Sequence, residues 1–117
     1  MNIQKHIVIA AIVAQQQGRI VSHVYDYTQS KYVHVYFTST RNSKHIHMYD
    51  SERKSYVVGT LPSIYDYASG AYINLRISGN TFNGYDYESG FHFNGTISGR
   101  MVNIYDFQQG RYFNFGL

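Results

Sequence analysis

The stretch 64–70, IYDYASG, returns as GYDYESG at 84–90 and as IYDFQQG at 104–110, so each copy starts 20 residues after the previous one. Each final glycine is followed by a similar segment that ends in asparagine, at 71–74, 91–94 and 111–114. Repetition at a fixed period indicates a series of identical supersecondary units, each of which needs its neighbours to cover its apolar face. The unit here is a β-hairpin, because two short alternating segments flank a glycine turn.

The same phrase is less regular in the first half of the chain. A copy at 24–30, VYDYTQS, has Ser30 in place of the glycine, and MYD at 48–50 is a degenerate copy. Tyrosine–aspartate pairs therefore begin at positions 25, 49, 65, 85 and 105, with spacings of 24, 16, 20 and 20 residues. We expect irregular hairpins over 1–62 and regular hairpin repeats over 63–117.

The composition favours an all-β fold. The 117 residues include 13 tyrosines, 7 phenylalanines and 10 glycines but a single proline, a mixture typical of strands and tight turns. Short strands joined by tight turns leave no room for parallel crossovers. We therefore predict a single domain over 1–117, an antiparallel up-and-down meander of about 10–11 short strands that forms a β-barrel or a strongly curled sheet.

The apolar run at 7–14, IVIAAIVA, follows Lys5 and His6 and loosely resembles a signal peptide. It is too short to span a bilayer, and its β-branched residues favour a buried strand, with a turn at 15–18. The chain has no cysteine, which excludes disulfides, thiolate nucleophiles and cysteine-based metal sites. This leaves the compartment open, with the cytoplasm favoured over secretion, and we predict no membrane span.

Turn chemistry predicts which side chains share a face. In 67–71, YASGA, a three-residue loop closed by a left-handed glycine pairs Tyr67 with Ala71 and Tyr65 with Ile73. One face then holds the apolar core, including Tyr65, Tyr67 and Ile73. The opposite face carries a polar row in each repeat: Asp66, Tyr72 and Asn74, then Asp86, His92 and Asn94, then Asp106, Tyr112 and Asn114.

Two features bear on this register. A two-residue Ser-Gly loop would put the aspartates on the core face, and we reject it because burying three carboxylates without cationic partners is costly. However, the apolar residues Ile64, Phe82, Val102 and Ile104 have the parity of the aspartate face. Either a β-bulge near Gly84 moves these side chains to the core face, or part of the aspartate face is also covered by protein.

The polar rows are the best candidate for a binding site. Aromatic rings flanked by carboxylates and amides on a rigid sheet suit stacking on a sugar ring and bonding to its hydroxyls, although such side chains also bond to one another across strands. We therefore expect a non-enzymatic module that binds a carbohydrate or small polar ligand. One alternative is a structural or self-assembling protein that forms homo-oligomers through free edge strands, and another is a barrel with an internal small-molecule cavity.

The evidence for metal binding, catalysis or nucleic-acid binding is weaker. His34, His45 and His47 are candidate metal ligands if the loop near 40–43 brings their imidazoles together, but paired histidines in a strand are usually only exposed, so we predict no metal and no cofactor. No nucleophile elbow, phosphate loop or metalloprotease motif is present, so we predict no enzyme. The charge of +3 is scattered and the aspartates face the same way as the aromatics, so nucleic acid is an unlikely partner.

The tyrosine–aspartate pairs, the glycine turn and the 20-residue period over 64–117 resemble the repeats of large bacterial shell toxins and teneurins. The resemblance implies a β-hairpin spiral that serves as a structural wall, without catalytic residues in the repeats. Here an extra aromatic residue, such as Tyr67, separates each pair from its turn.

Overall fold

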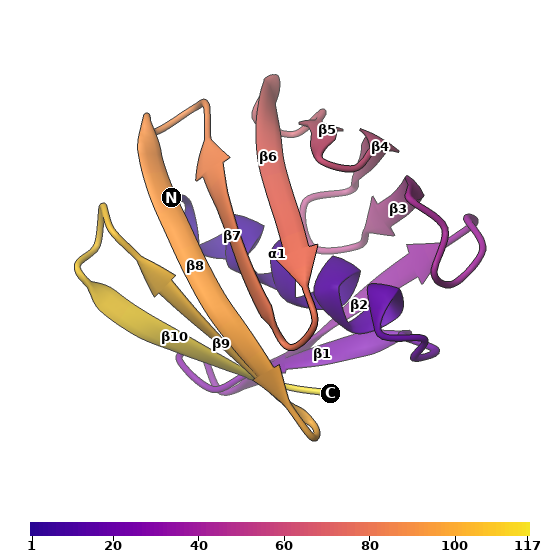
Figure 1. The fold of residues 1–117 in the computed structure, drawn as a ribbon, viewed down its shortest axis with the longest axis horizontal. Helices are drawn as coiled ribbons and strands as arrows, with labels where there is room; N and C mark the ends of the chain where they lie inside the picture. The colour runs from indigo at the N-terminus through magenta and orange to yellow at the C-terminus, as the bar shows by residue number, and fades with distance from the viewer.

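The computed structural model describes residues 1–117 and is a closed antiparallel β-barrel of ten strands with one helix running through its middle (Figure 1). The elements, in chain order, are α1 (Ile3–Gln16), β1 (His23–Asp26), β2 (Lys31–Phe37), β3 (His45–Asp50), β4 (Ser55–Thr60), β5 (Ser63–Asp66), β6 (Ala71–Ser78), β7 (Thr81–Asp86), β8 (Phe91–Ser98), β9 (Met101–Asp106) and β10 (Arg111–Gly116).

Each strand pairs with the strands before and after it in the sequence, and β1 closes the ring by pairing with β10. At that seam Tyr25 lies opposite Gly116 and Asp26 opposite Phe115. The predicted up-and-down meander and barrel are therefore confirmed. Because every strand is paired on both sides, the free edges on which edge-strand assembly depended do not exist.

The prediction of a strand at 7–14 is wrong, because this segment lies inside helix α1. Every residue from Lys5 to Gln15 is buried. A helix that is apolar all round is typical of one enclosed by protein, and its lack of polar periodicity is what made it resemble a buried strand. The Asn2 side chain caps the helix by accepting from the backbone N–H of Gln4 at 2.8 Å.

The predicted register is also wrong. The loop after Asp66 has four residues, so Asp66 lies opposite Ala71, Tyr65 opposite Tyr72, and Ile64 opposite Ile73. Asp66 is fully buried, whereas Tyr67 is 60% exposed. The predicted core is therefore correct at Ile73 but wrong at the tyrosines of the repeated phrase, which point outward.

The corrected register removes the parity conflict without a face-switching bulge. Ile64, Phe82, Val102 and Ile104 share the inner face with the aspartates, and all four are buried. The aspartate face of the strands therefore lines the lumen of the barrel, and α1 covers it.

Two reciprocal pairs shape the wall between β7 and β8. Phe82 lies opposite Gly95, and Gly84 lies opposite Phe93. A Cβ at Gly84 would come within 2.4 Å of the Phe93 ring, and one at Gly95 within 2.4 Å of the Phe82 ring. Each phenylalanine therefore covers the space above a glycine, which lets large rings fill the lumen beside the helix.

Candidate ligand-binding face

All five aspartates of the chain lie at one end of the barrel, which we call the aspartate end. They are the last residues of the five odd-numbered strands: Asp26, Asp50, Asp66, Asp86 and Asp106. Each is buried and is followed by a four-residue turn. The degenerate copy at 48–50 thus has the same structure as the regular ones.

The aspartate side chains hold the turns in shape. Asp106 Oδ1 accepts from the backbone N–H groups of Gln108 at 2.9 Å and Gln109 at 3.2 Å, and Asp26 and Asp50 accept in the same way from their own turns. An aspartate that bonds to the backbone two residues later makes an Asx turn. The aspartate in each repeated phrase therefore has a local structural role.

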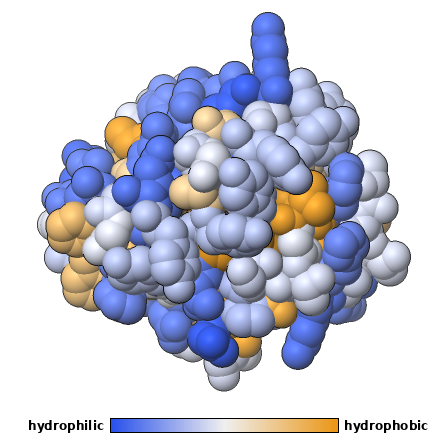
Figure 2. Space-filling view, turned by 90° about the horizontal axis from the view of Figure 1, so that it is seen from above, coloured by the Kyte–Doolittle hydropathy of each residue, from blue (hydrophilic) through white to orange (hydrophobic).

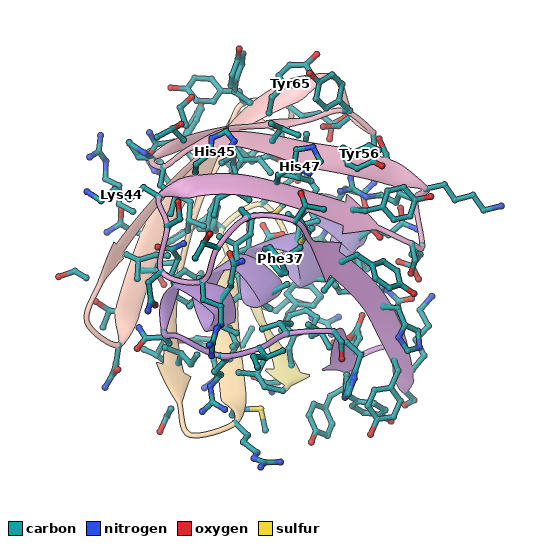
Figure 3. The ribbon with its side chains drawn as sticks, turned by 90° about the vertical axis from the view of Figure 1, so that its right-hand side faces the viewer. Phe37, Lys44, His45, His47, Tyr56 and Tyr65 are labelled. Carbon is teal, nitrogen blue, oxygen red and sulfur yellow. The ribbon has the colours of Figure 1, made fainter.

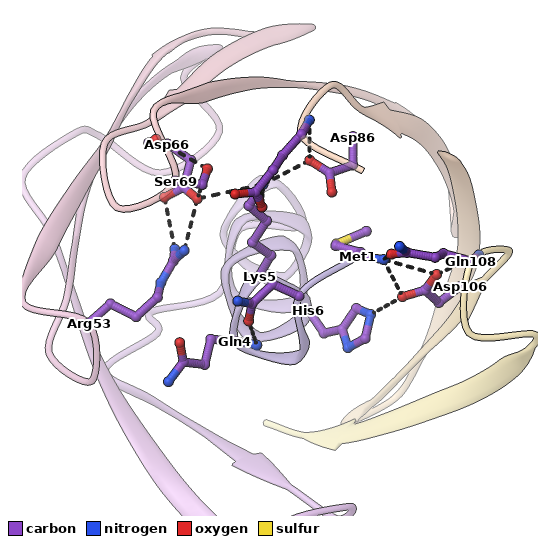
Figure 4. Close-up of polar contacts among 12 residues, drawn as sticks. Met1, Gln4, Lys5, His6, Arg53, Asp66, Ser69, Asp86, Asp106 and Gln108 are labelled. Carbon is purple, nitrogen blue, oxygen red and sulfur yellow. Dashed lines mark hydrogen bonds and ion pairs between the residues drawn. The ribbon is translucent and has the colours of Figure 1, made fainter. Parts of the chain in front are cut away.

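Cations from the helix and one turn pair with three of the five buried carboxylates, those of Asp50, Asp66 and Asp86, and Figure 4 shows the contacts of Asp66 and Asp86. Lys5 Nζ lies 2.8 Å from Asp86 Oδ1 and 2.9 Å from Glu88 Oε1. Arg53 donates to Asp50 at 2.8 Å and makes two bonds to Asp66 at 2.8 and 2.9 Å. These are the cationic partners whose apparent absence led to the wrong register.

The protonation states follow from these contacts. Burial alone raises the pKa of Asp86, but the hydrogen bond and charge of Lys5 outweigh it, so the pKa lies below its usual 3.8. Burial tends to lower the pKa of the Arg53 guanidinium, but Asp66 and Asp50 raise it overall. The lowered pKa of Asp86 and the raised pKa of Arg53 both favour the charged form, which a buried ion requires a partner to keep.

His6 differs because burial lowers its pKa below 6.5 more than Asp106 raises it. Its Nε2 lies 2.8 Å from Asp106 Oδ2, and its Nδ1 has no partner. A neutral imidazole that donates its Nε2–H to the carboxylate fits both observations. The amino group of Met1, 3.1 Å from Asp106 Oδ2, supplies the positive charge at this carboxylate.

The predicted site residues Asp66, Asp86 and Asp106 are therefore not on the same face as the tyrosines and asparagines. They lie in an enclosed cluster that fastens α1 inside the barrel. At the other end of the barrel, Gln16 and Gln17 donate to the carbonyls of Ser43 and Gly79, each at 2.6 Å, and fasten the C-terminal end of the helix.

The other six predicted site residues do lie together on the outside of the barrel: Tyr72, Asn74, His92, Asn94, Tyr112 and Asn114. The register places three of them, Asn94, Tyr112 and Asn114, in two rows across the strands, whereas Tyr72, Asn74 and His92 lie in neither row. One row is Arg76, Asn83, Asn94, Tyr105 and Tyr112, and the next is Ser78, Thr81, Thr96, Asn103 and Asn114.

Parts of these rows on β8, β9 and β10 line an open depression of about 610 Å³. It is lined by Asn94, Gly95, Thr96, Asn103, Tyr112 and Asn114. Sequence reasoning found three of these residues and missed Gly95, Thr96 and Asn103. Asn103 lies opposite both Thr96 and Asn114, and only the barrel register reveals this.

Aromatic rings border the depression. Tyr112 is 63% exposed, and its ring packs edge-on against Tyr105 with the centroids 4.8 Å apart. The same arrangement recurs one repeat earlier between His92 and Tyr85, also at 4.8 Å. On the face of the molecule drawn in Figure 2, hydrophilic residues predominate and apolar residues reach the surface in separate places.

The three candidate histidines do not form a cluster. His34 pairs with His23 on β1, whereas His45 and His47 lie on β3 outside the barrel, where His47 contacts Tyr56 with ring centroids 5.2 Å apart (Figure 3). The Thr38 side chain lies 2.6 Å from His47 Nδ1. No three His, Cys, Asp or Glu side chains are arranged to hold a metal ion.

The lumen gives no support to the internal-cavity alternative, because α1 and the inward side chains occupy it. The helix does not have the length and apolarity needed to span a membrane. The outer polar depression is therefore the remaining candidate site.

Comparison with known proteins adds no functional information, since no protein-family model, curated protein or solved structure matches the chain.

Proposed function

We propose that the protein is a non-catalytic binding module whose ligand is a carbohydrate or another small molecule rich in hydroxyls, held in the depression over β8–β10. One observation carries the proposal: three asparagines, a threonine and an exposed tyrosine converge there on a paired sheet.

The chemistry of these side chains suits hydroxyl groups. Each asparagine offers two N–H donors and a carbonyl acceptor, so it can bond to neighbouring hydroxyls that both donate and accept. The ring of Tyr112 offers a flat apolar surface to the C–H face of a sugar. Because adjacent strands carry these groups, their spacing is fixed before the ligand arrives, which lowers the entropic cost of binding.

The test is a glycan array, followed by calorimetry on any sugar that binds. Tyr112→Ala and Asn114→Ala should each weaken binding about tenfold or more, because a well-placed contact contributes over 1 kcal/mol. Tyr32→Ala is the matched control, because Tyr32 is 62% exposed and packs on Tyr25 with the centroids 4.8 Å apart, as Tyr112 packs on Tyr105.

Two outcomes would overturn the proposal. One is an array with no binding to any sugar. The other is a sugar whose affinity falls equally in Tyr112→Ala and Tyr32→Ala, since the aromatic rim as a whole, and not the depression, would then hold it.

A rival function is self-assembly, favoured by the exposed rings on the turns at Tyr27, Tyr67, Tyr87 and Phe107. It predicts a concentration-dependent sedimentation coefficient that Tyr67→Ser and Tyr87→Ser abolish. A monomer at all concentrations would exclude it.

A further inference from the structure

The outer surface is far more basic than the net charge of +3 suggests. All five aspartates are buried, so Glu52 and Glu88 are the only other carboxylate side chains. Of the ten lysines and arginines, Lys5 and Arg53 are committed to the aspartates, which leaves eight. The sequence argument that aspartates beside the aromatics would repel an anionic ligand therefore fails.

The remaining charges are also unequally distributed between the two ends of the barrel. Glu52 and Glu88 both lie in turns at the aspartate end, where they pair with Lys31 and Lys5. The opposite end, which we call the basic end, holds the C-terminal end of α1 and the loops after the even-numbered strands. Its cationic side chains are Arg19, Arg41, Lys44, Arg76 and Arg100, and no carboxylate lies within ion-pair distance of any of them.

Two of these guanidiniums are held in place without being neutralised. Arg41 donates to the carbonyl of Gly18 at 3.0 Å, and Arg19 donates to the carbonyl of Gly99. A guanidinium has five N–H groups, so each keeps several for an incoming anion. Two depressions flank the end of the helix, one of about 310 Å³ that includes Arg19 and one of about 210 Å³ that includes Lys44 and Arg76.

The basic end is continuous with the candidate ligand-binding face. Arg76 lies opposite Asn83, which lies opposite Asn94 in the first polar row. Arg100 precedes β9 directly and is three residues from Asn103, about 10 Å along the strand. A chain of sugars a few residues long can therefore lie on the asparagines and reach these arginines.

We propose that the ligand of this face is an acidic polysaccharide, with its hydroxyls on the asparagine rows and its carboxylate or sulfate groups at the basic end. This inference rests on the proposed function and narrows it to a chemical class. Arginine suits both groups because its fork of N–H donors matches their oxygens.

The distribution of aromatic residues favours a polysaccharide over single-stranded nucleic acid. A nucleic-acid groove needs stacking platforms interleaved with cations along one path. Here the exposed turn aromatics, such as Tyr67, Tyr87 and Phe107, are at the aspartate end, whereas the unpaired arginines are at the other. What lies beside the arginines is a set of amide and hydroxyl groups.

The experiment measures binding of the full chain to a neutral glucan oligosaccharide, to its sulfated or uronic-acid counterpart of equal length, and to oligo(dT). The acidic sugar should bind at least tenfold tighter than the neutral one, with an affinity that falls as salt rises. Arg76→Gln with Arg100→Gln should remove that preference while leaving the affinity for the neutral sugar unchanged. Lys31→Gln with Lys54→Gln, which removes the same charge at the aspartate end, should have less than a threefold effect.

The outcomes separate this inference from the proposed function. Equal affinity for neutral and acidic sugars would overturn the acidic preference alone. Tighter binding of oligo(dT), lost in the arginine variant, would overturn it in favour of nucleic acid. Binding of neither sugar would overturn both proposals.

Discussion

The two ends of the barrel use charge in opposite ways. At the aspartate end, carboxylates point into the lumen and meet Lys5 from the helix and Arg53 from a turn. At the basic end, Arg76 and Arg100 are exposed and have no carboxylate partner. The first arrangement fixes the helix and the turns, whereas the second leaves positive charge without a partner in the structure. Charge therefore contributes to stability at the aspartate end, and in the function we propose it contributes to recognition at the basic end.

The test of this contrast with the largest expected effect is Lys5→Met, which removes the cation but keeps an apolar side chain of similar length. Asp86 would be left buried beside Glu88 without its counter-charge, so the free energy of unfolding should fall by about 3–5 kcal/mol. Arg100→Met at the basic end is the control and should change it by less than about 0.5 kcal/mol. Urea unfolding followed by circular dichroism measures both.

Adding Asp86→Asn to Lys5→Met should restore part of the loss, because the unpaired charge is removed as well. Equal effects of Lys5→Met and Arg100→Met would show that the two ends do not differ in the way described.

A second test compares glycines that face inward and outward. A Cβ at Gly84 would lie 2.0 Å from the carbonyl oxygen of Asn74, so Gly84→Ala must displace the wall and should cost about 2–3 kcal/mol. Gly79, in the turn at the basic end, has φ of +58° and open space around it. Gly79→Ala should therefore cost only about 1 kcal/mol, from backbone strain. Thermal unfolding measures both, and a larger loss for Gly79→Ala would contradict the packing described for β7 and β8.

A third test locates acid sensitivity at the aspartate end. The pKa of His6 is lower in the folded chain than its ordinary 6.5, so the unfolded chain binds more protons as the pH falls through 6.5. Stability should therefore decline below about pH 6.5, by at most about 1.4 kcal/mol per pH unit. Asp86 and Asp106 have pKa values lowered below 3.8, so their contribution is lost only at more acidic pH.

His6→Gln should remove the decline that begins near pH 6.5 while leaving the one at more acidic pH, where Asp86 and Asp106 become protonated. His47→Gln, on the outside of β3, is the control and should keep both. If stability still declines near pH 6 in His6→Gln, a group other than His6 causes the acid sensitivity.

The sequence predicted the antiparallel meander, because the 20-residue period and the glycine turns are local signals. It left open whether the sheet closes, because the pairing of β1 with β10 joins the two ends of the meander. It did not predict the helix, since 7–14 is apolar on every side and such a run fits a buried helix or a buried strand equally. That error led to the next one. With Lys5 assigned to the margin of a strand, no cation was available for the aspartates, and the register that buries them seemed too costly.

The correct register did leave a signal in the sequence. Ile64, Phe82, Val102 and Ile104 all had the parity of the aspartates, and four apolar residues on one face outweigh a guess about loop length. The polar depression was half predictable for the same reason: Tyr112 and Asn114 point outward in either register. Asn103 was missed because it lies on the strand before the turn, and only pairing places it beside Asn114.

The smallest effect expected concerns the geometry of the turns at the aspartate end. Lys54 and Ser30 adopt φ of +53° and +54° in turns where the other three copies have glycine, such as Gly70 at +68°. A left-handed conformation costs a residue with a Cβ about 1 kcal/mol, part of which the greater freedom of glycine in the unfolded chain offsets. Lys54→Gly should therefore stabilise the protein by about 0.5 kcal/mol, and Lys54→Asn by a similar amount, because asparagine tolerates this region. The reverse change, Gly70→Lys, should cost about as much, since a Cβ there meets nothing closer than the Tyr65 hydroxyl at 3.7 Å. Thermal unfolding of the three variants measures these changes in stability. A loss of stability in Lys54→Gly would mean that the Lys54 side chain stabilises the protein by more than its left-handed backbone conformation costs.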